Sequence, residues 1–338
     1  MLTIKFKNTD LIVSRLCLGT GTFGGRGVYK KSGDVPQKEA NEIIGIALDN
    51  GVNLFDTAEI YSDGVAEIML GKALESRRHE AIVITKTAPY KNEAGRLTFT
   101  RSQIAESCNS SLKRLNTDYI DIYELHSFAP DTPLEETLEA LNDLVKQGKV
   151  RYIGCSNFAA WQMMKGLSIS DLNNLSRFVT LEAKYSMLCR ELEYELVPAC
   201  LDQGVNILAF SPLYGGFLSG KYSRNSPWPS GTRFSSENDT GRWTIDKEKL
   251  FDMVEVMEKI ALNNDTTVSH VALNYLLCKA GVSSLIIGVR NSRQLLDNLD
   301  ISDKYISEDE LELIDRLTEP ASLYPYMNSH VCKSESNV

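Results

Sequence analysis

The chain has 338 residues, of which 43% are hydrophobic and 24% charged, and its formal net charge at pH 7 is -9. This composition allows a large buried core and excludes a disordered or collagen-like chain. The acidic balance argues against a general affinity for nucleic acid or anionic lipid, since either would attract a basic face.

The sequence contains no signal for a membrane or for export. No stretch approaches the roughly 18 consecutive apolar residues of a membrane span, and the start MLTIKFKNTD lacks the apolar region of a signal peptide. We expect a cytoplasmic protein that acts on small molecules, as a monomer or homo-oligomer, without a membrane or nucleic-acid partner. The seven cysteines are scattered without C-x-x-C spacing, so we expect them to be reduced and mostly buried.

Predicted strands alternate with helical patterns along most of the chain. A short hairpin is predicted first, in KFKNTDLIV (5–13), and two helical patterns, 292–299 and 307–317, come last. Between them, eight runs rich in Val, Ile, Leu and Tyr are predicted as strands at 14–20, 52–58, 81–86, 119–126, 150–157, 178–186, 206–213 and 284–289. Eight strands with helical crossovers predict an α/β fold, a (β/α)8 TIM barrel with an N-terminal β-hairpin and extra C-terminal helices.

Helix-start signals support this fold independently of the strands. Thr132-Pro133-Leu134-Glu135 has the pattern of an N-cap, a proline at the first helical position and a capping-box acid; Thr100–Gln103 and Ser307–Glu310 carry the same box. No linker rich in Pro, Gly or Ser divides the sequence, so we expect a single domain over residues 1–338. The long irregular stretch 214–245 exceeds ordinary loop length, which predicts a functional role.

Ionisable residues end three consecutive predicted strands. The catalytic groups of such barrels lie at the carboxyl ends of the strands. Strand alternation places Asp56, Lys86 and His126 on inward faces that are otherwise largely apolar. Tyr61 follows a few residues after Asp56, so we predict that all four side chains meet at one mouth of the barrel.

These four residue types suit proton transfer. A carboxylate beside Lys86 would compensate a charge that is otherwise strongly disfavoured in an interior. The lysine would favour the phenolate of Tyr61 and lower its pKa from about 10 toward the working range of an acid–base catalyst. His126 would hydrogen-bond the substrate oxygen or assist the transfer. Each residue alone is more typical of a satisfied structural position, but the four together favour a site.

The motifs around these residues resemble the aldo-keto reductase family, in particular its potassium-channel β-subunit-like and bacterial sugar or aldehyde members. The similarity runs nearly end to end, through GVNLFDTAEIYSDGVAEIMLGKAL (51–74), VITK (83–86), YIDIYELH (119–126), GKVRYIGCSNF (148–158), CRELEYELVPACLDQGVNILAFSPLYGGFLSGKY (189–222) and IIGVRNSRQLLDN (286–298). The resemblance implies an NADP-dependent oxidoreductase that interconverts an aldehyde or ketone and its alcohol. The family's catalytic tetrad falls on Asp56, Tyr61, Lys86 and His126, with Tyr61 as proton donor to the carbonyl that receives the hydride.

The resemblance also implies a groove for NADP(H). Ser156 and Asn157 would hold the nicotinamide carboxamide, and Phe210 would stack on the ring. The other implied cofactor residues are Gly21, Thr22 and Asp56 near the ring, Ser211, Leu213, Gly215, Lys221 and Arg233 at the pyrophosphate, Gly288 and Arg290 at the 2'-phosphate, and Gln294 and Asn298 at the adenine. Arg290 argues for NADPH over NADH, and a helix beginning near Ser292 would offer free N–H groups to a phosphate.

The substrate side is less defined by the sequence. GTGTFG (19–24) matches a dinucleotide fingerprint, but the segment after it cannot supply the required helix, so we predict a loop. The implied substrate-binding residues are Phe23, Tyr61, His126 and Phe128, with Tyr90, Trp228 and Tyr324 as further apolar candidates. The polar segments 89–98 and 127–131 would admit a sugar or keto-sugar alongside simple aldehydes.

The chain departs from the family pattern at Glu182, where glutamine is usual. An ionised Glu182 near the nicotinamide would favour NADP+ and alcohol oxidation, because a charge pair at about 4 Å is worth up to roughly 4 kcal/mol at an effective dielectric of 20. The other interpretation is that Glu182 is protonated or salt-bridged to a neighbour. The sequence leaves both open, together with the preferred direction of the reaction.

Two other classes of function compete with this one. The first alternative is a channel- or partner-binding regulatory protein with vestigial activity, since potassium-channel β subunits share the barrel. Those subunits carry asparagine where this chain has His126, and this difference favours an enzyme. A metal-dependent barrel hydrolase needs paired histidines on a strand. The histidines at 79, 126, 270 and 330 contain no such pair, so no metal is expected.

Overall fold

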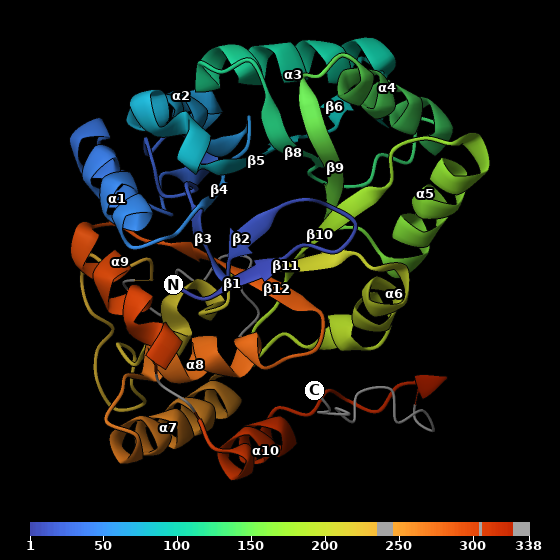
Figure 1. The fold of residues 1–338 in the computed structure, drawn as a ribbon. Coiled ribbons are helices and arrows are strands. Elements are labelled where there is room, and N and C mark those ends of the chain that lie inside the picture. Colours follow the sequence, from blue (N-terminus) through green and yellow to red (C-terminus); the bar gives the residue numbers. More distant parts are fainter. Residues whose placement is uncertain (235–245, 304–305, 327–338) are drawn as a thin grey trace.

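The computed structural model describes residues 1–234, 246–303 and 306–326. Eight parallel strands form a closed barrel in the order β10-β11-β12-β3-β4-β5-β8-β9, surrounded by helices (Figure 1). The strands are β3 Leu16–Gly19, β4 Leu54–Asp56, β5 Ile82–Thr87, β8 Ile120–Leu125, β9 Val150–Ser156, β10 Phe178–Lys184, β11 Asn206–Phe210 and β12 Val282–Gly288. The predicted (β/α)8 TIM barrel is therefore confirmed.

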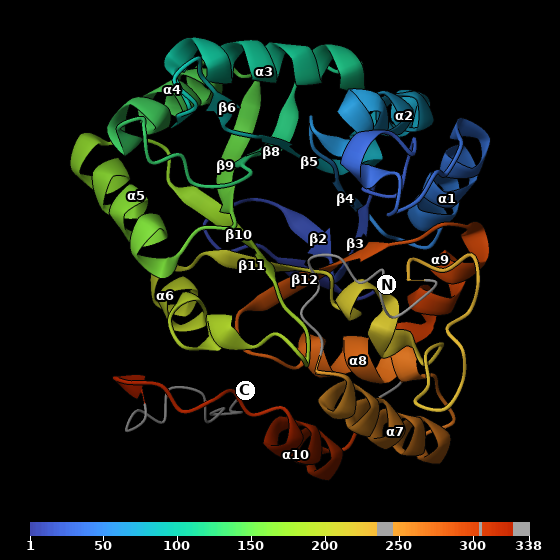
Figure 2. The same cartoon turned by 180° about the vertical axis from the view of Figure 1, so that it is seen from behind.

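The outer helices cover the barrel on all sides (Figures 1 and 2). They are α1 Gln37–Asp49, α2 Val65–Leu74, α3 Arg101–Leu115, α4 Leu134–Lys146, α5 Ala160–Asn173, α6 Leu196–Gln203, α7 Lys247–Asn263, α8 Val268–Leu277, α9 Ser292–Leu299 and α10 Glu308–Leu317. The last two match the predicted C-terminal helices. A hairpin in the loop after β5, formed by β6 Tyr90–Lys91 and β7 Leu97–Thr98, was not predicted.

Two of the three predicted helix caps are present. The Thr100 side chain caps α3 and the Gln103 side chain bonds back to the Thr100 N–H, and Ser307 with Glu310 forms the same box on α10. The predicted cap at Thr132 is wrong. Pro133 precedes the first residue of α4 without a side-chain cap, and the Thr132 hydroxyl accepts from the Phe99 N–H at 3.0 Å instead.

The N-terminal hairpin closes one end of the barrel. Strand β1 (Thr3–Lys5) pairs antiparallel with β2 (Ile12–Ser14), as predicted, and Figure 1 shows the hairpin across the barrel opening. Phe6, Leu11 and Val13 are buried against the interior side chains of the strands: Cys17, Leu54, Ile84, Ile122, Leu208 and Ile286. The barrel interior next to the hairpin is thus a packed apolar core. The polar side chains of the interior lie toward the carboxyl ends of the strands.

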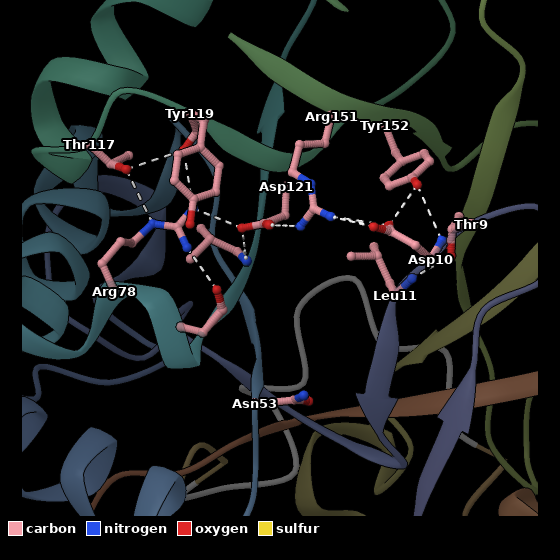
Figure 3. A network of polar contacts seen from close by, with 12 residues as sticks. Thr9, Asp10, Leu11, Asn53, Arg78, Thr117, Tyr119, Asp121, Arg151 and Tyr152 are labelled. Carbon is pink, nitrogen blue, oxygen red and sulfur yellow. Dashed lines mark hydrogen bonds and ion pairs between the residues drawn. The ribbon is translucent and has the colours of Figure 1, made fainter. Parts of the chain in front are cut away.

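An ion-pair network ties the hairpin to the amino ends of the strands (Figure 3). Asp121 of β8 is buried, and its carboxylate accepts from Arg78 at 2.7 Å, from Arg151 at 2.8 Å and from the Val83 N–H at 3.0 Å. Arg151 also reaches Asp10 in the hairpin turn at 3.1 Å. Four separate segments are therefore joined through one buried carboxylate.

The structure bears on two expectations from the sequence, the absence of a membrane span and the reduced, mostly buried state of the cysteines. Within residues 1–234, 246–303 and 306–326, no helix has both the length and the apolar character needed to cross a membrane. Cys17, Cys108, Cys155 and Cys200 are unpaired and buried, Cys189 is half-buried and Cys278 is exposed. Cys332 lies outside the described residues.

Candidate active site

A cavity of about 1040 Å³ opens at the carboxyl ends of the barrel strands. Its wall contains most of the residues that the sequence proposed for catalysis or cofactor binding. They are Gly21, Thr22, Asp56, Tyr61, His126, Asn157, Glu182, Phe210, Ser211, Leu213, Gly215, Lys221, Arg233, Gly288, Arg290, Gln294 and Asn298. One continuous cavity therefore joins groups from both halves of the chain.

The structure brings the four predicted catalytic residues together. Lys86 is fully buried, and its ammonium donates to the Asp56 carboxylate, to the Thr57 carbonyl at 3.1 Å and to the Tyr61 hydroxyl at 3.4 Å. The rings of Tyr61 and His126 meet edge to face, with centroids 5.8 Å apart. Lysine, phenol and imidazole thus form one contiguous group, in which Tyr61 and His126 line the cavity and Lys86 is buried next to them.

The backbone that presents Tyr61 is held in an unusual conformation. Tyr61 begins the 3-10 helix η2 (Tyr61–Gly64), in which Ser62 and Asp63 have φ values of 50° and 57°. Left-handed non-glycine residues cost free energy and persist where surrounding contacts impose them. Here the Ser62 hydroxyl donates to the Phe23 carbonyl at 2.6 Å. The tight turn fixes Tyr61 relative to the strand that carries Asp56.

Glu59 connects the same loop to its neighbours. Its carboxylate accepts from the Ala88 N–H at 2.7 Å and from the hydroxyls of Thr87 and Ser107. The loops after β4 and β5 are therefore bound to each other and to α3, directly beside Tyr61.

Asn157 and Ser211 follow strands β9 and β11 and are also left-handed, with φ values of 56° and 55°. The Asn157 amide donates to the His126 carbonyl at 3.0 Å and to the buried Ser156 hydroxyl at 2.9 Å. Strained loop residues thus recur around the cavity, as is typical of functional sites.

The acid–base properties of the site differ in part from the prediction. Burial raises the pKa of Tyr61 well above its ordinary value, although the Lys86 charge acts in the opposite direction. The predicted net lowering is therefore wrong: desolvation of the phenolate outweighs the ammonium. Burial and the Lys86 charge lower the pKa of His126 to about 3. The imidazole is neutral at pH 7, and the phenol keeps its proton.

Two predicted substrate residues do not reach the cavity wall. Phe23 is completely buried in the core between barrel and helices. Phe128 is half-buried and packs edge-on against Phe158 and Trp161, with ring centroids 5.6 and 5.7 Å apart. Each backbone lies beside the site, but apolar packing draws the side chain away from it.

The further apolar candidates lie elsewhere as well. Trp228 packs in an aromatic cluster with Phe217 and Tyr222. Tyr324 is 87% exposed and Tyr90 is 38% exposed, and neither is part of the cavity wall.

Other residues line the cavity near Tyr61 that the sequence did not single out. The Tyr29 ring, from the 3-10 helix η1 (Gly27–Tyr29), lies 4.8 Å from the Tyr61 ring, centroid to centroid. Ile60 and Ala88 also form the wall, and so do Pro89 and Ser127, the first residues of the predicted segments 89–98 and 127–131. The position of Ala88 directly after β5 could have identified it, but Tyr29 lies far from any strand end and carries no comparable signal.

Part of the cavity wall is cationic. Lys221, Arg233 and Arg290 form it, and burial together with the charges of the two arginines lowers the pKa of Lys221. Three cations close enough to influence one another favour an anionic ligand. The described part of the predicted functional stretch, residues 214–234, supplies two of them; residues 235–245 lie outside the described ranges.

Arg290 and two N–H groups at the start of α9, predicted to be available to a phosphate, already make hydrogen bonds within the protein. The Arg290 guanidinium donates to the carbonyls of Lys31, Ser32 and Gly231 at 3.0 to 3.1 Å. It therefore ties the loop after β3 to the loop after β11. At the N-terminus of α9, the Ser292 N–H is bonded to Glu39 and the Gln294 N–H to Asn291. The expectation of free N–H groups is wrong for these two, because side chains cap them.

Glu182 occupies the boundary between the cavity and the barrel interior. Its Oε2 lies 3.1 Å from the Lys86 ammonium, and its side chain is 4% exposed. Of the two interpretations left open by the sequence, this corresponds to the second, in which Glu182 is protonated or salt-bridged to a neighbour: burial raises its pKa well above the ordinary value.

Comparison with known proteins identifies the family. The model of the Aldo/keto reductase family matches residues 15–319. The chain belongs to the aldo/keto reductase family. Aldo/keto reductases are oxidoreductases that use nicotinamide cofactors. The cavity lies at the carboxyl ends of the strands, where TIM-barrel enzymes have their active sites.

Several individual aldo/keto reductases are similar to this chain. The uncharacterized oxidoreductase YrpG of Bacillus subtilis is 35% identical, over 86% of this chain and 88% of that one. A probable voltage-gated potassium channel subunit beta of Arabidopsis thaliana is 32% identical, over 88% and 90%. The NADH-specific methylglyoxal reductase of Escherichia coli is 31% identical, over 94% and 99%. Among solved structures, the thermostable aldo-keto reductase Tm1743, in complex with the inhibitor epalrestat, matches with a TM-score of 0.74 and 29% identity, over 94% of this chain and all of that one.

Proposed function

We propose that this protein is an NADP(H)-dependent oxidoreductase that interconverts an aldehyde or ketone and its alcohol, with Tyr61 as the proton donor. The observation that carries the proposal is the contact of one buried ammonium, that of Lys86, with both Asp56 and the Tyr61 hydroxyl in the cavity wall. The neutral His126 lies beside them.

The residues of the cavity suit a nicotinamide dinucleotide. His126 Nδ1 is buried and has no hydrogen-bond partner among the described residues, so a polar ligand group would satisfy it. Asn157 and Phe210 would contact the ring end, and Lys221 and Arg233 the phosphates. When bound, the cofactor supplies or accepts a hydride.

Tyr61 keeps its proton until the substrate oxygen needs it. Because burial raises the pKa of the phenol, Tyr61 binds the carbonyl oxygen as a hydrogen-bond donor. The proton moves to that oxygen as negative charge develops on it, and the Lys86 ammonium at 3.4 Å stabilises the phenolate that remains. The neutral imidazole of His126 can donate one N–H to the same oxygen.

The preference for NADP over NAD rests on the cations in the cavity wall. Lys221, Arg233 and Arg290 support it together, and Arg290 also bonds three main-chain carbonyls. The E. coli relative is named as NADH-specific, so both cofactors belong in the test.

A purely partner-binding role is the alternative, suggested by the name of the Arabidopsis relative. The convergence of Asp56, Tyr61, Lys86 and His126 in one contact group favours catalysis, because binding a partner protein does not require it.

The test is turnover of a panel of aldehydes, ketones and sugars, followed by the absorbance of NADPH and, separately, of NADH. We expect NADPH to support the higher kcat/KM. Tyr61→Phe should lower kcat by about 10²- to 10⁴-fold while the affinity for the cofactor stays unchanged. Full activity in Tyr61→Phe would refute the proton-donor role, and the absence of turnover with every carbonyl would refute the enzyme.

A further inference from the structure

Three carboxyl groups and one ammonium are buried together inside the barrel, near the carboxyl ends of the strands. Asp56 of β4, Glu124 of β8 and Glu182 of β10 are 2%, 0% and 3% exposed, and Lys86 of β5 is 0% exposed. No group of three or more His, Cys, Asp or Glu in residues 1–234, 246–303 and 306–326 could hold a metal ion. Lys86 is therefore the cation that this cluster, which we call the carboxyl cluster, has to share.

The contacts within the carboxyl cluster are incomplete. Lys86 bonds Asp56 and lies 3.1 Å from Glu182 Oε2. Glu124 pairs with Lys86 in the strand register, and one of its oxygens accepts from the Thr180 hydroxyl at 2.7 Å. Its other oxygen is buried without a hydrogen-bond partner. One ammonium thus faces more carboxylate oxygens than it can satisfy.

Full ionisation of the carboxyl cluster would leave an excess of negative charge in a dry interior. Such a charge is disfavoured, and neighbouring carboxyl groups avoid it by retaining protons between them. Burial raises the pKa of Glu124 to about 7 and that of Glu182 well above its ordinary value. At least one proton is accordingly held in the cluster at neutral pH.

Glu182 is the member placed to exchange that proton with the reaction. It lines the cavity together with Asp56, whereas Glu124 is not part of the wall. Of the two lining groups, Asp56 accepts directly from Lys86, while burial raises the pKa of Glu182 well above its ordinary value. Glu182 touches Lys86, which touches Tyr61, so a path of two contacts leads from its carboxyl group to the proton donor. The ionisable groups that surround it come from several elements: Cys17 of β3, Asp56 of β4, Tyr61 of η2, Lys86 of β5, Glu124 of β8, His126 after β8 and Lys184 of β10.

We propose that Glu182 is the proton store of the reaction: it holds a proton while the nicotinamide ring is neutral and releases it when the ring becomes positive. The proposal rests on the proposed function. After Tyr61 has protonated the substrate oxygen, Lys86 gives one of its protons to the Tyr61 phenolate, and the Tyr61 O–H bond forms again. The O–H bond of Glu182 breaks and its proton passes to Lys86, which remains an ammonium. The Glu182 carboxylate then faces the positive ring, and solvent returns its proton when the oxidised cofactor leaves.

This scheme predicts which cofactor form is linked to pH. NADP+ binding should displace a proton from Glu182, so its affinity should rise with pH by up to about tenfold per unit while free Glu182 is protonated. NADPH binding should displace none from this residue. Other groups of the cofactor titrate in both forms, so the ratio of the two dissociation constants isolates Glu182.

The first experiment is calorimetric titration of each cofactor form in buffers of different ionisation enthalpy, across the pH range. The wild type should release more protons with NADP+ than with NADPH, and Glu182→Gln should remove the difference. Glu124→Gln keeps the Glu182 carboxyl group but removes a neighbouring negative charge, so the linkage should persist at lower pH. Equal proton release with both forms in the wild type, or an unchanged difference in Glu182→Gln, would overturn the inference.

A single turnover followed with a pH-indicator dye tests the transfer itself. In the wild type, proton uptake from solvent should lag behind the loss of NADPH absorbance, whereas in Glu182→Gln the two should coincide. Coincident signals in the wild type would overturn the proton store while leaving the proposed function intact. Failure of both cofactor forms to bind would instead refute the proposed function, and this inference with it.

Discussion

His126 is a neutral imidazole beside a buried ammonium. Its pKa is lowered to about 3 by burial and by the charge of Lys86. A histidine that cannot take up a proton at working pH acts as a hydrogen-bond donor or acceptor and not as a cationic acid. The residue thus complements Tyr61, the proposed proton donor.

The depressed pKa of His126 makes stability depend on pH. In the unfolded chain the imidazole binds a proton near pH 6.5, but in the folded chain only near pH 3. The unfolded state therefore gains protons first, and stability is lost as pH falls below about 6.5. Between pH 7 and pH 5 this one residue should cost about 2 kcal/mol.

His126→Asn, which cannot titrate, isolates that contribution. Urea unfolding at pH 7 and pH 5 should show a smaller loss of stability in the variant than in the wild type. Other groups titrate in both proteins, so only the difference between the two losses is informative. Identical losses would show that His126 is protonated in the folded protein as well.

Strand ends let the sequence predict which ionisable side chains meet, because alternation fixes which side chains face inward. Asp56, Lys86 and His126 needed no further information. The direction of the Tyr61 pKa shift could not be predicted, since it depends on how deeply the hydroxyl is buried. The bonds of Arg290 to loop carbonyls were equally out of reach, because those loops meet only in the folded chain.

Helix α3 contacts the loops beside the site, so its stability bears on how those loops are held. Its Ser107 hydroxyl donates to Glu59, which also accepts from the backbone of the loop after β5. The N-terminus of α3 is fixed by the capping box of Thr100 and Gln103, whose two bonds satisfy two otherwise unpaired N–H groups.

Removal of this cap should weaken the helix measurably. Thr100→Ala should lower the free energy of unfolding by about 1 kcal/mol, while Thr100→Ser, which keeps the hydroxyl, should retain most of it. Denaturant unfolding of the three proteins provides the measurement. Equal losses in the alanine and serine variants would assign the effect to the methyl group and not to the cap.

Sequence signals for helix caps predict the structure correctly where the capping hydrogen bonds join residues close in sequence. The Thr100 and Ser307 boxes close within four residues, so sequence alone reveals them. Thr132 carries the same signal, but Phe99, distant in sequence, supplies the competing N–H. The two-residue strands β6 and β7 are too short for a periodic pattern, and they escaped prediction for that reason.

The two ends of the barrel treat buried charge differently. At the cavity end, three carboxyl groups share one lysine and retain protons. At the amino ends of the strands, Asp121 meets two arginines and a main-chain N–H, so every contact complements its charge (Figure 3). The first arrangement suits proton chemistry, and the second suits stability.

Asp121→Asn should therefore destabilise the protein without affecting catalysis. Loss of the buried charge leaves Arg78 and Arg151 without their shared partner, which should cost about 3 kcal/mol. Asp10→Asn removes an exposed partner of the same Arg151 and should cost only a small fraction of that. Urea unfolding measures both variants, and kcat/KM should equal the wild-type value because the network lies at the opposite end from the cavity. Similar losses in the two variants would mean that burial does not strengthen the Asp121 contacts, and a changed kcat/KM would mean that the two ends of the barrel are coupled.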